Sequence, residues 1–349
     1  MSEARFGIAF VEQPPEPTQG RYVQLAESRG FESAWALETR LMRDGIAPLA
    51  AWAARTDRIA LGTAMINPFT RTPTLMAQTF ATLDELSGNR SILGIGAANQ
   101  MLVEAFHGES FELPLTRTKE TVEAFRELMT GERVTYEGRT VSIDGAKLDF
   151  SPPRPDVPVY MGVTGPKMLK LAGAIADGVV LNAFISEGYH RNAIALIEEG
   201  AREAGRARPD VGAVPVFSIG SDEATAKAAV KPMLAEYVCN LPGLEQARRD
   251  VGDPLLERDD VTEDVMVPVR EALETEGLGA AAEFVPDWLV DELAAAGTAA
   301  TCLAKLEESF DYGLDFLVPS FLGGNVGYGI DRIAEHFDLD PTGYAGANR

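Results

Sequence analysis

Polar residues directly follow apolar stretches at several points of the chain, and one of these points is especially informative. Ile59 to Met65 is an apolar, strand-like stretch, and Asn67-Pro-Phe-Thr-Arg71 comes immediately after it. A helix is predicted next, from Thr72 to Ser87. A buried strand that ends in polar residues just before a helix is typical of a ligand site at one end of an α/β barrel.

A second segment with the same character runs from Gly162 through Val163, Thr164, Gly165 and Pro166 to Lys167. A glycine lets backbone N–H groups approach a ligand, and proline suits the first turn of a helix. A helix N-terminus favours an anion, and the lysine adds a positive charge where the helix dipole otherwise disfavours one. The segment therefore predicts a site for an anionic ligand. A simple turn with a helix cap is the alternative.

The other predicted strand ends are rich in Gly, Asn, Ser and Thr and contain few catalytic groups. Glu38 is the only acidic residue directly at a strand end, whereas a glycosidase needs two facing carboxylates. No Ser-His-Asp order is present, and neither the three histidines nor Cys239 and Cys302 show metal-site spacing. We therefore expect neither a metal site nor a disulfide framework. This pattern favours a cofactor that carries the chemistry while the protein positions it.

Strand-like and helix-like segments alternate along the whole chain. The predicted strands are 5–11, 31–37, 59–65, 91–95, 159–162, 179–181, 211–219 and 316–319. The predicted helices are 20–29, 44–55, 72–87, 116–129, 165–176, 187–204, 222–238, 297–312 and 329–337. Short connections between β-then-α units imply parallel strands, so the predicted fold is an α/β (β/α)₈ TIM barrel with insertions. A doubly wound sheet is the alternative, but the loop Glu12 to Pro15 lacks the glycines typical of that fold.

The 349 residues are expected to form a single barrel domain with two insertions. Alternating, Gly-punctuated residues near 131–150 predict a hairpin. Residues 241–286 are too many for an ordinary loop and predict a mostly helical insertion.

Composition limits the partners. The net charge is −22, with no visible cluster of basic residues, which argues against a nucleic-acid partner. Only seven of the 31 basic residues are lysine. This acidic, lysine-poor composition suggests a halophilic protein, with an ordinary acidic enzyme from a GC-rich genome as the alternative. The chain shows neither a signal-peptide pattern nor an 18-residue apolar run, so we expect a soluble, cytoplasmic protein without membrane contact.

Three segments together resemble a known superfamily. They are Leu61 to Arg71, Ala81 to Gly96 and Pro158 to Gly178. They are similar to the bacterial-luciferase-like proteins, most of all to the coenzyme F420-dependent branch and especially to the methylenetetrahydromethanopterin reductases. The resemblance covers most of residues 4–220 and returns near Gly297 and at 316–320.

The resemblance implies a homodimeric barrel that binds a deazaflavin at the carboxyl ends of its strands. It also implies a non-proline cis peptide at Ala64–Met65, behind the ring system, with a β-bulge of trans geometry as the alternative. The expected cofactor-binding residues are Thr63, Ala64, Met65, Asn67, Gly96, Ala97, Asn99 and Gly162 to Lys167. Among these, Gly96 to Asn99 would lie beside the ring, and Gly162 to Lys167 near the phosphate. For Thr63 and Asn67, a purely structural role at the Pro68 turn is the alternative.

The sequence departs from the reductase pattern at two carboxylates. Ala9 stands where the reductases have Glu, and Asn99 stands where they have Asp. Glu38 is therefore the best remaining acid–base candidate, with a structural carboxylate as the alternative. The expected activity is hydride transfer between F420 and a small organic substrate. The two alternatives are an FMN-dependent monooxygenase of the same superfamily and a non-catalytic member that binds a cofactor.

Overall fold

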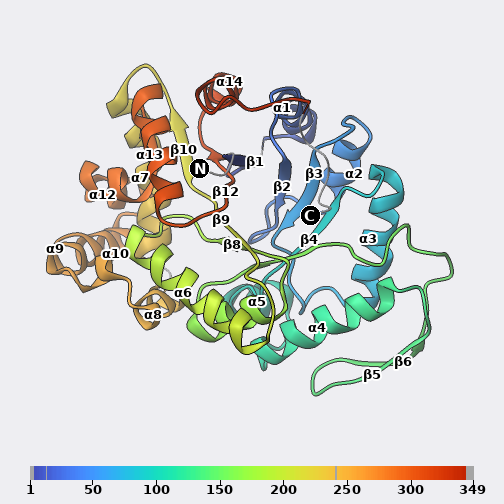
Figure 1. The fold of residues 1–349 in the computed structure, drawn as a ribbon. Coiled ribbons are helices and arrows are strands. Elements are labelled where there is room, and N and C mark those ends of the chain that lie inside the picture. The colour runs from blue at the N-terminus through green and yellow to red at the C-terminus, as the bar shows by residue number, and fades with distance from the viewer. Residues whose placement is uncertain (1–3, 13, 240–241, 343–349) are drawn as a thin grey trace.

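The structure is a computed structural model that describes residues 4–12, 14–239 and 242–342, and it is a closed barrel of parallel strands surrounded by helices (Figure 1). The predicted (β/α)₈ fold is confirmed. The barrel strands, in order, are β1 (Arg5–Phe10), β2 (Ser33–Leu37), β3 (Ala60–Ala64), β4 (Ser91–Ile95), β7 (Val159–Gly162), β8 (Gly178–Leu181), β9 (Asp210–Ala213) with β10 (Val216–Ile219), and β12 (Phe316–Leu317) with β13 (Ser320–Phe321).

The barrel closes because β1 pairs in parallel with β2 on one side and with β12 and β13 on the other. The seventh and eighth barrel strands are each interrupted, at Pro215 and at Pro319. Proline has no N–H to donate to a strand ladder, which explains why the predicted continuous strand 211–219 divides into β9 and β10. The short strand β11 (Ala295–Gly297) pairs with β10 and was not predicted.

Helices cover the outside of the barrel. They are α1 (Glu16–Ser28), α2 (Ala47–Ala53), α3 (Pro73–Ser87), α4 (Pro114–Met129), α5 (Pro166–Ile175), α6 (Glu187–Glu203), α7 (Glu223–Cys239), α13 (Ala299–Asp311) and α14 (Val326–His336), with a π-helical turn η1 (Leu102–Phe106) after β4. Helices α1 and α4 begin before their predicted starts because their first turns contain proline, which needs no N–H partner there. Helix α2 begins three residues late, and Asp44 instead accepts hydrogen bonds from Ile46 and Ala47.

Strands β5 (Val134–Glu137) and β6 (Ser142–Ala146) form an antiparallel hairpin outside the barrel. Glu120 of α4 holds its turn, because the carboxylate accepts backbone N–H groups of Arg139, Thr140 and Val141 at 2.8–3.0 Å. A side chain on Gly138 would lie 2.5 Å from this carboxylate. Burial alone would raise the pKa of Glu120, but the Thr140 hydroxyl and these N–H donors outweigh it and lower the pKa.

Short helices fill most of residues 242–293. They are α8 (Pro242–Val251), η2 (Pro254–Glu257), α9 (Asp259–Val261), η3 (Thr262–Met266), α10 (Val267–Thr275), α11 (Leu278–Glu283) and α12 (Asp287–Leu293). The predicted start of the insertion, Leu241, lies outside the described residues. The segments from η2 to α12 form a second apolar cluster with α7, Val216 and Phe184, whereas Val251 of α8 belongs to the larger cluster. Within the described ranges, no helix has the length and apolar character needed to span a membrane.

Candidate active site

The barrel interior is filled at one end and built of small residues at the other. Trp35, Tyr160 and Phe316 contact one another near the amino ends of the strands, with ring centroids 5.4 and 5.9 Å apart. Each ring lies against a glycine of an adjacent strand, at Gly62, Gly178 and Gly212. Because strand residues alternate between the two faces, the next inward positions toward the carboxyl end are Ala9, Leu37, Ala64, Gly162, Val214 and Val318, all smaller than the three rings. We call this end the mouth of the barrel.

The Ala64–Met65 bond is cis, so the expected cis peptide is confirmed at this position. The Met65 side chain extends from it over the ends of β4 and β7. A Cβ atom added to Gly162 would lie 2.5 Å from Met65 Cγ, and one added to Gly96 would lie 3.4 Å from Met65 Cβ. These glycines therefore leave room for Met65, and the two chain segments form one wall of the mouth.

Thr63 holds this wall from behind. Its hydroxyl donates to the Gly94 carbonyl at 2.7 Å and accepts from the Gly94 N–H at 3.0 Å. The side chain is completely buried, and its hydroxyl is engaged by Gly94 both as donor and as acceptor. These two hydrogen bonds join β3 to β4, which is a structural role different from the one at the Pro68 turn that the sequence offered as the alternative for Thr63.

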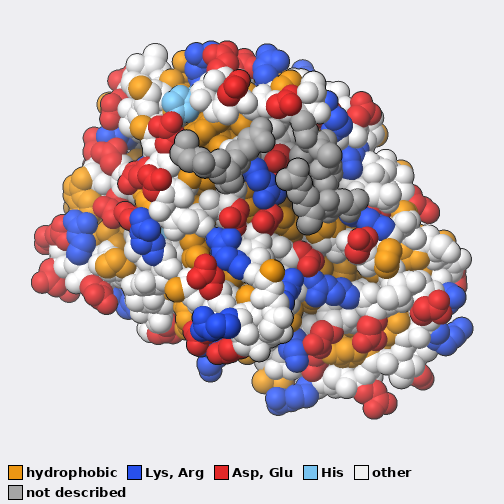
Figure 2. All heavy atoms as spheres, viewed as in Figure 1, with side chains coloured by type: hydrophobic (Ala, Val, Ile, Leu, Met, Phe, Trp, Pro, Cys, Tyr) orange, Lys and Arg blue, Asp and Glu red, His pale blue; other side chains and the backbone are white. Residues whose placement is uncertain are grey.

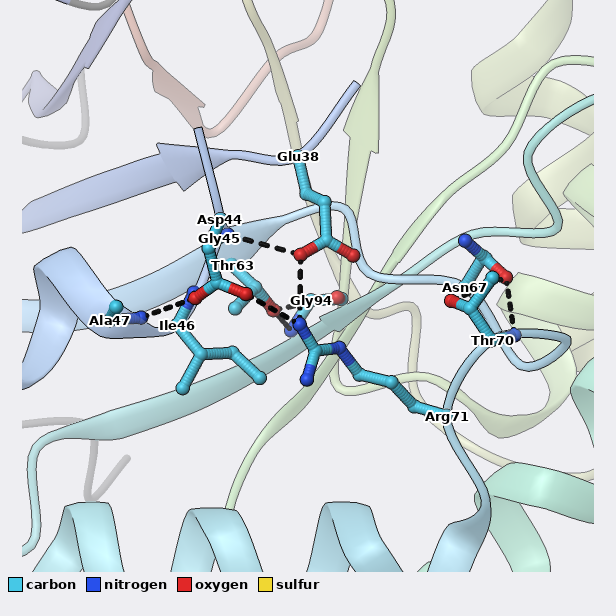
Figure 3. Close-up of polar contacts among 10 residues, drawn as sticks. All are labelled: Glu38, Asp44, Gly45, Ile46, Ala47, Thr63, Asn67, Thr70, Arg71 and Gly94. Carbon is cyan, nitrogen blue, oxygen red and sulfur yellow. Dashed lines mark hydrogen bonds and ion pairs between the residues drawn. The ribbon is translucent and has the colours of Figure 1, made fainter. Parts of the chain in front are cut away.

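Asn67 organises the turn after β3. Its Oδ1 accepts hydrogen bonds from the backbone N–H groups of Phe69 and Thr70, both at 3.0 Å, and Figure 3 shows the contact with Thr70. Arg117 of α4 adds a hydrogen bond to the Pro68 carbonyl at 3.0 Å. The structural alternative is therefore observed for the Asn67 carbonyl oxygen, while Figure 3 shows its amide nitrogen directed away from the turn.

Glu38 lies at the end of β2, within an ion-pair network that the sequence did not reveal. One carboxylate oxygen, Oε2, accepts from Gly45 N–H at 3.0 Å and from Arg71 at 3.1 Å. The same Arg71 nitrogen binds Asp44 at 2.8 Å. The second oxygen of Glu38 points away from these partners (Figure 3). Glu38 is thus held by one oxygen and presents the other.

The opposite charges of this network shift the pKa values of Arg71 and Asp44. Burial alone would lower the pKa of Arg71, but Glu38 and Asp44 outweigh it and raise the pKa. Burial alone would likewise raise the pKa of Asp44, but the N–H groups of Ala47 and Ile46, together with Arg71, lower it. The network therefore favours the ionised forms of Arg71 and Asp44 at neutral pH.

The loop after β4 approaches the mouth through glycine and alanine. Gly96 is buried, Ala97 is partly exposed, and Ala98 adopts a positive φ of 58°, which is uncommon for a residue with a side chain. Asn99 is exposed, and its Oδ1 accepts a hydrogen bond from Leu102 N–H at 2.9 Å. Asn99 therefore caps the next helical turn.

The segment Gly162 to Lys167 leads into α5. Gly165 precedes the helix, Pro166 is its first residue, and Lys167 is exposed in the first turn. Val163 is buried, and the Thr164 carbonyl accepts a hydrogen bond from the buried Tyr189 hydroxyl at 2.5 Å. The orientation of Thr164 is thereby fixed. The first-turn N–H groups of α5 and Lys167 meet the chemical requirements of an anion site.

Helix α8 of the insertion lies beside this segment, since a Cβ on Gly165 would come 3.8 Å from Ala247 Cβ. An ion pair at the end of α8 holds it there. Arg248, which is 1% exposed, donates to Asp253 at 2.7 Å, and Ser186 at the start of α6 donates to the same carboxylate at 2.6 Å. The insertion thus contributes to one side of the mouth.

Asn182 follows β8 and faces inward. Its Oδ1 accepts from the Tyr237 hydroxyl at 2.9 Å and from Ala183 N–H at 2.9 Å. Burial raises the pKa of Tyr237, which keeps its hydroxyl a donor. One residue before Tyr237 on α7, Glu236 pairs with Arg40 of the loop after β2 at 2.8 Å. Helix α7 therefore bridges the two sides of the mouth.

The expected residues of β3, β4 and β7 lie on one side of the mouth. Glu38 lies beside them, at the end of the neighbouring strand β2. The Thr63 hydroxyl is engaged by Gly94, and the Asn99 Oδ1 is engaged by Leu102 N–H. The sequence placed Arg71 after the third strand without revealing its ion pairs, and it missed Tyr189 and Tyr237, whose roles depend on contacts between distant segments. Asn182 directly follows a strand. The alternation of side chains between the two faces of that strand is the signal that identifies it as inward-facing.

Comparisons with known proteins find relatives that span most of the chain. A family model described as luciferase-like monooxygenase matches residues 9–315. The chain belongs to this luciferase-like family. It is 37% identical over 316 residues to the 5,10-methylenetetrahydromethanopterin reductase of Methanolobus tindarius, which covers 90% of this chain and 93% of that protein.

Two solved structures extend the similarity to the whole fold of this luciferase-like chain. The coenzyme F420-dependent tetrahydromethanopterin reductase of Methanopyrus kandleri superposes with a TM-score of 0.82 at 30% identity, over 96% of this chain and 100% of that one. An F420-dependent secondary alcohol dehydrogenase, solved with an F420–acetone adduct, superposes with a TM-score of 0.77 at 25% identity, over 95% and 98% of the two chains.

Proposed function

We propose that this luciferase-like protein is a coenzyme F420-dependent oxidoreductase that transfers a hydride between the deazaflavin and a small organic substrate. The observation that carries the proposal is the glycine-lined wall of Met65, Gly96 and Gly162 beside the N-terminus of α5. It would place an apolar wall for a ring system beside helix N–H groups that suit an anion. The similarity to F420-dependent reductases over nine-tenths of the chain supports it.

The residues present suit such a cofactor. Ala64, Met65, Gly96 and Ala97 would lie along the planar ring, while Gly162 to Lys167 would hold the phosphate through backbone N–H groups and one lysine. The inward residues beyond the packed Trp35, Tyr160 and Phe316 rings are smaller than these rings. When bound, the deazaflavin supplies hydride chemistry at its C5 carbon.

The protein's own contribution would be placement and proton handling. Thr63 and Asn67 fix the wall through backbone hydrogen bonds, and the bond from Tyr189 to the Thr164 carbonyl fixes the anion site. Glu38 would hold or accept a proton of the substrate through its second oxygen, while Arg71 and Gly45 N–H keep the first oxygen in place.

A titration of the purified protein with F420 tests the proposal. We expect saturable binding, absorbance near 420 nm that is lost on reduction, and turnover with a hydride acceptor. A bound flavin, with NADH consumed only in the presence of oxygen, would instead support an FMN-dependent monooxygenase. F420 binding without turnover on any acceptor would support a non-catalytic member. Absence of F420 binding would overturn the proposal.

We also propose a cytoplasmic homodimer. Leu75 and Leu86 of α3 are 44% and 59% exposed and offer apolar surface for a second copy, although scattered exposed leucines are common on monomers. Light scattering at elution from a sizing column distinguishes the 37.5 kDa chain from a species of twice that mass. Elution as the single chain would contradict the dimer.

A further inference from the structure

Ser320 faces the inside of the barrel. It pairs in register with Ala9 of β1, and paired residues of parallel strands point to the same face. Ala9 belongs to the interior cluster, as does Val318 two residues before Ser320. The backbone ladder continues past this point, because Val11 N–H donates to the Phe321 carbonyl at 3.3 Å. Ser320 therefore lies inside the mouth, beside the small Ala9 side chain.

The Ser320 hydroxyl is buried without a hydrogen-bond partner among the described residues, and the residue is 1% exposed. A buried hydroxyl that makes no hydrogen bond destabilises the fold by about 1–3 kcal/mol. Such a group in the core of a binding region needs an explanation, and a bound molecule that accepts its hydrogen bond is one.

The position of Ser320 indicates which molecule this would be. In an eight-stranded barrel the third strand faces the seventh, so the wall formed by Ala64 and Met65 faces the strand made of β9 and β10. Ser320 on the eighth strand and Asn182 after the sixth strand flank that facing strand. Both residues therefore lie across the mouth from the wall proposed for the cofactor ring. This is the side from which a substrate must approach the ring.

Asn182 is prepared for the same role. Its Oδ1 already accepts hydrogen bonds from the Tyr237 hydroxyl and Ala183 N–H, so its amide N–H₂ is the group left to donate to a ligand. The mouth thus has two hydrogen-bond donors on one side. Leu322, two residues after Ser320, is partly exposed at the start of the loop that contains Gly323, whose φ is 88°.

We propose that Ser320 is a specificity-determining residue that donates a hydrogen bond to the substrate, with Asn182 as the second donor. The substrate class is a molecule whose hydride-exchanging carbon is bonded to an accepting heteroatom, as in a ketone or a cyclic C=N or C–N group. This inference rests on the proposed F420-dependent function. It assigns the donors on the substrate side, opposite the cofactor wall.

The experiment compares the wild type with Ser320→Ala in two titrations. The first measures F420 affinity by fluorescence. The second measures, by calorimetry on the F420-loaded protein, the binding of two probes, acetone and tetrahydromethanopterin. We expect unchanged F420 affinity and a loss of about 3- to 10-fold in affinity for whichever probe the wild type binds. Thr121→Val is the matched control, because Thr121 of α4 is also buried without a partner among the described residues but lies on the outer helix layer.

The outcomes separate the two proposals. A thermal melt of Ser320→Ala should match or exceed that of the wild type, since the change removes an unsatisfied group, and this excludes misfolding as the cause of weak binding. Equal loss of F420 and probe affinity would overturn the assignment to the substrate side, and so would no loss of either. F420 binding with neither probe bound would leave the proposed function standing and overturn this substrate class. No F420 binding would overturn both.

Discussion

At the residue scale, Glu38 illustrates how position and partners decide a side chain's chemistry. Arg71 and Gly45 N–H hold one of its oxygens, and the other is directed away from them (Figure 3). We expect Glu38→Gln to lower turnover roughly 100-fold, the usual scale for loss of a positioned acid–base group. F420 affinity, measured by fluorescence titration, should be unchanged, because no part of the expected cofactor wall is altered.

Glu12→Gln is the control for that measurement, since Glu12 is an exposed carboxylate after β1. This variant should keep wild-type turnover. Wild-type turnover in Glu38→Gln as well would remove Glu38 from the mechanism and leave it as a structural anchor of the loop that contains Gly45.

Thr63 makes a second residue-scale prediction. Thr63→Val removes two hydrogen bonds between β3 and β4 while nearly preserving the side-chain volume. The variant should lower the free energy of unfolding by about 1–3 kcal/mol, because the Gly94 N–H loses its partner in the interior, while the Gly94 carbonyl keeps only the hydrogen bond from Ile66 N–H. Thr121→Val, which loses no such bond among the described residues, should show no comparable loss in denaturant titration. Equal stability of the two variants would contradict the assigned role of Thr63.

At the element scale, the β5–β6 hairpin depends on one carboxylate of α4. The pKa of Glu120 is lowered in the folded protein, so its ionised form stabilises the fold. This stability is fully present above the ordinary Glu pKa of about 4.3 and is lost as pH falls through the lower folded value. Glu120→Gln should therefore be less stable than the wild type at pH 7, and the difference should shrink progressively below about pH 4.

Hydrogen exchange of the hairpin amides is the local readout for this prediction. The N–H groups of Arg139, Thr140 and Val141 should exchange faster in Glu120→Gln than in the wild type, whereas amides of β4 should not change. A stability difference that stays constant from pH 7 to pH 3 would show that the carboxylate charge has no part in holding the hairpin.

At the scale of the whole molecule, net charge is the dominant property. The chain carries −22, and Figure 2 shows acidic side chains spread over the visible face, with basic ones between them. Such self-repulsion weakens as salt shortens the screening length from about 8 Å at 0.15 M to about 3 Å at 1 M. We expect the melting temperature to rise when KCl is increased over this range. A melting temperature that is constant or falls would contradict salt adaptation.

The sequence by itself determined the barrel and the family. Alternating apolar strands and helices leave few ways to bury both faces of a parallel sheet, so the order of elements was sufficient for the fold. Local errors came from proline, which divided the strand at Pro215 and moved helix starts, and from the short strand β11, whose three residues carry no periodic signal. The cis bond at Ala64–Met65 followed from the resemblance of a local segment.

Only the tertiary structure decided what the individual polar groups do. Thr63 and Asn99 satisfy backbone groups, Arg71 joins Glu38 to Asp44, and Tyr237 orients Asn182 from a helix 55 residues away. A hydrogen bond depends on distance and direction between groups that are far apart in the sequence, and residue type alone specifies neither. For the same reason, Ser320 can be proposed as a substrate-binding residue only from the structure. Its strand pairs with β1, and its hydroxyl has no hydrogen-bond partner among the described residues.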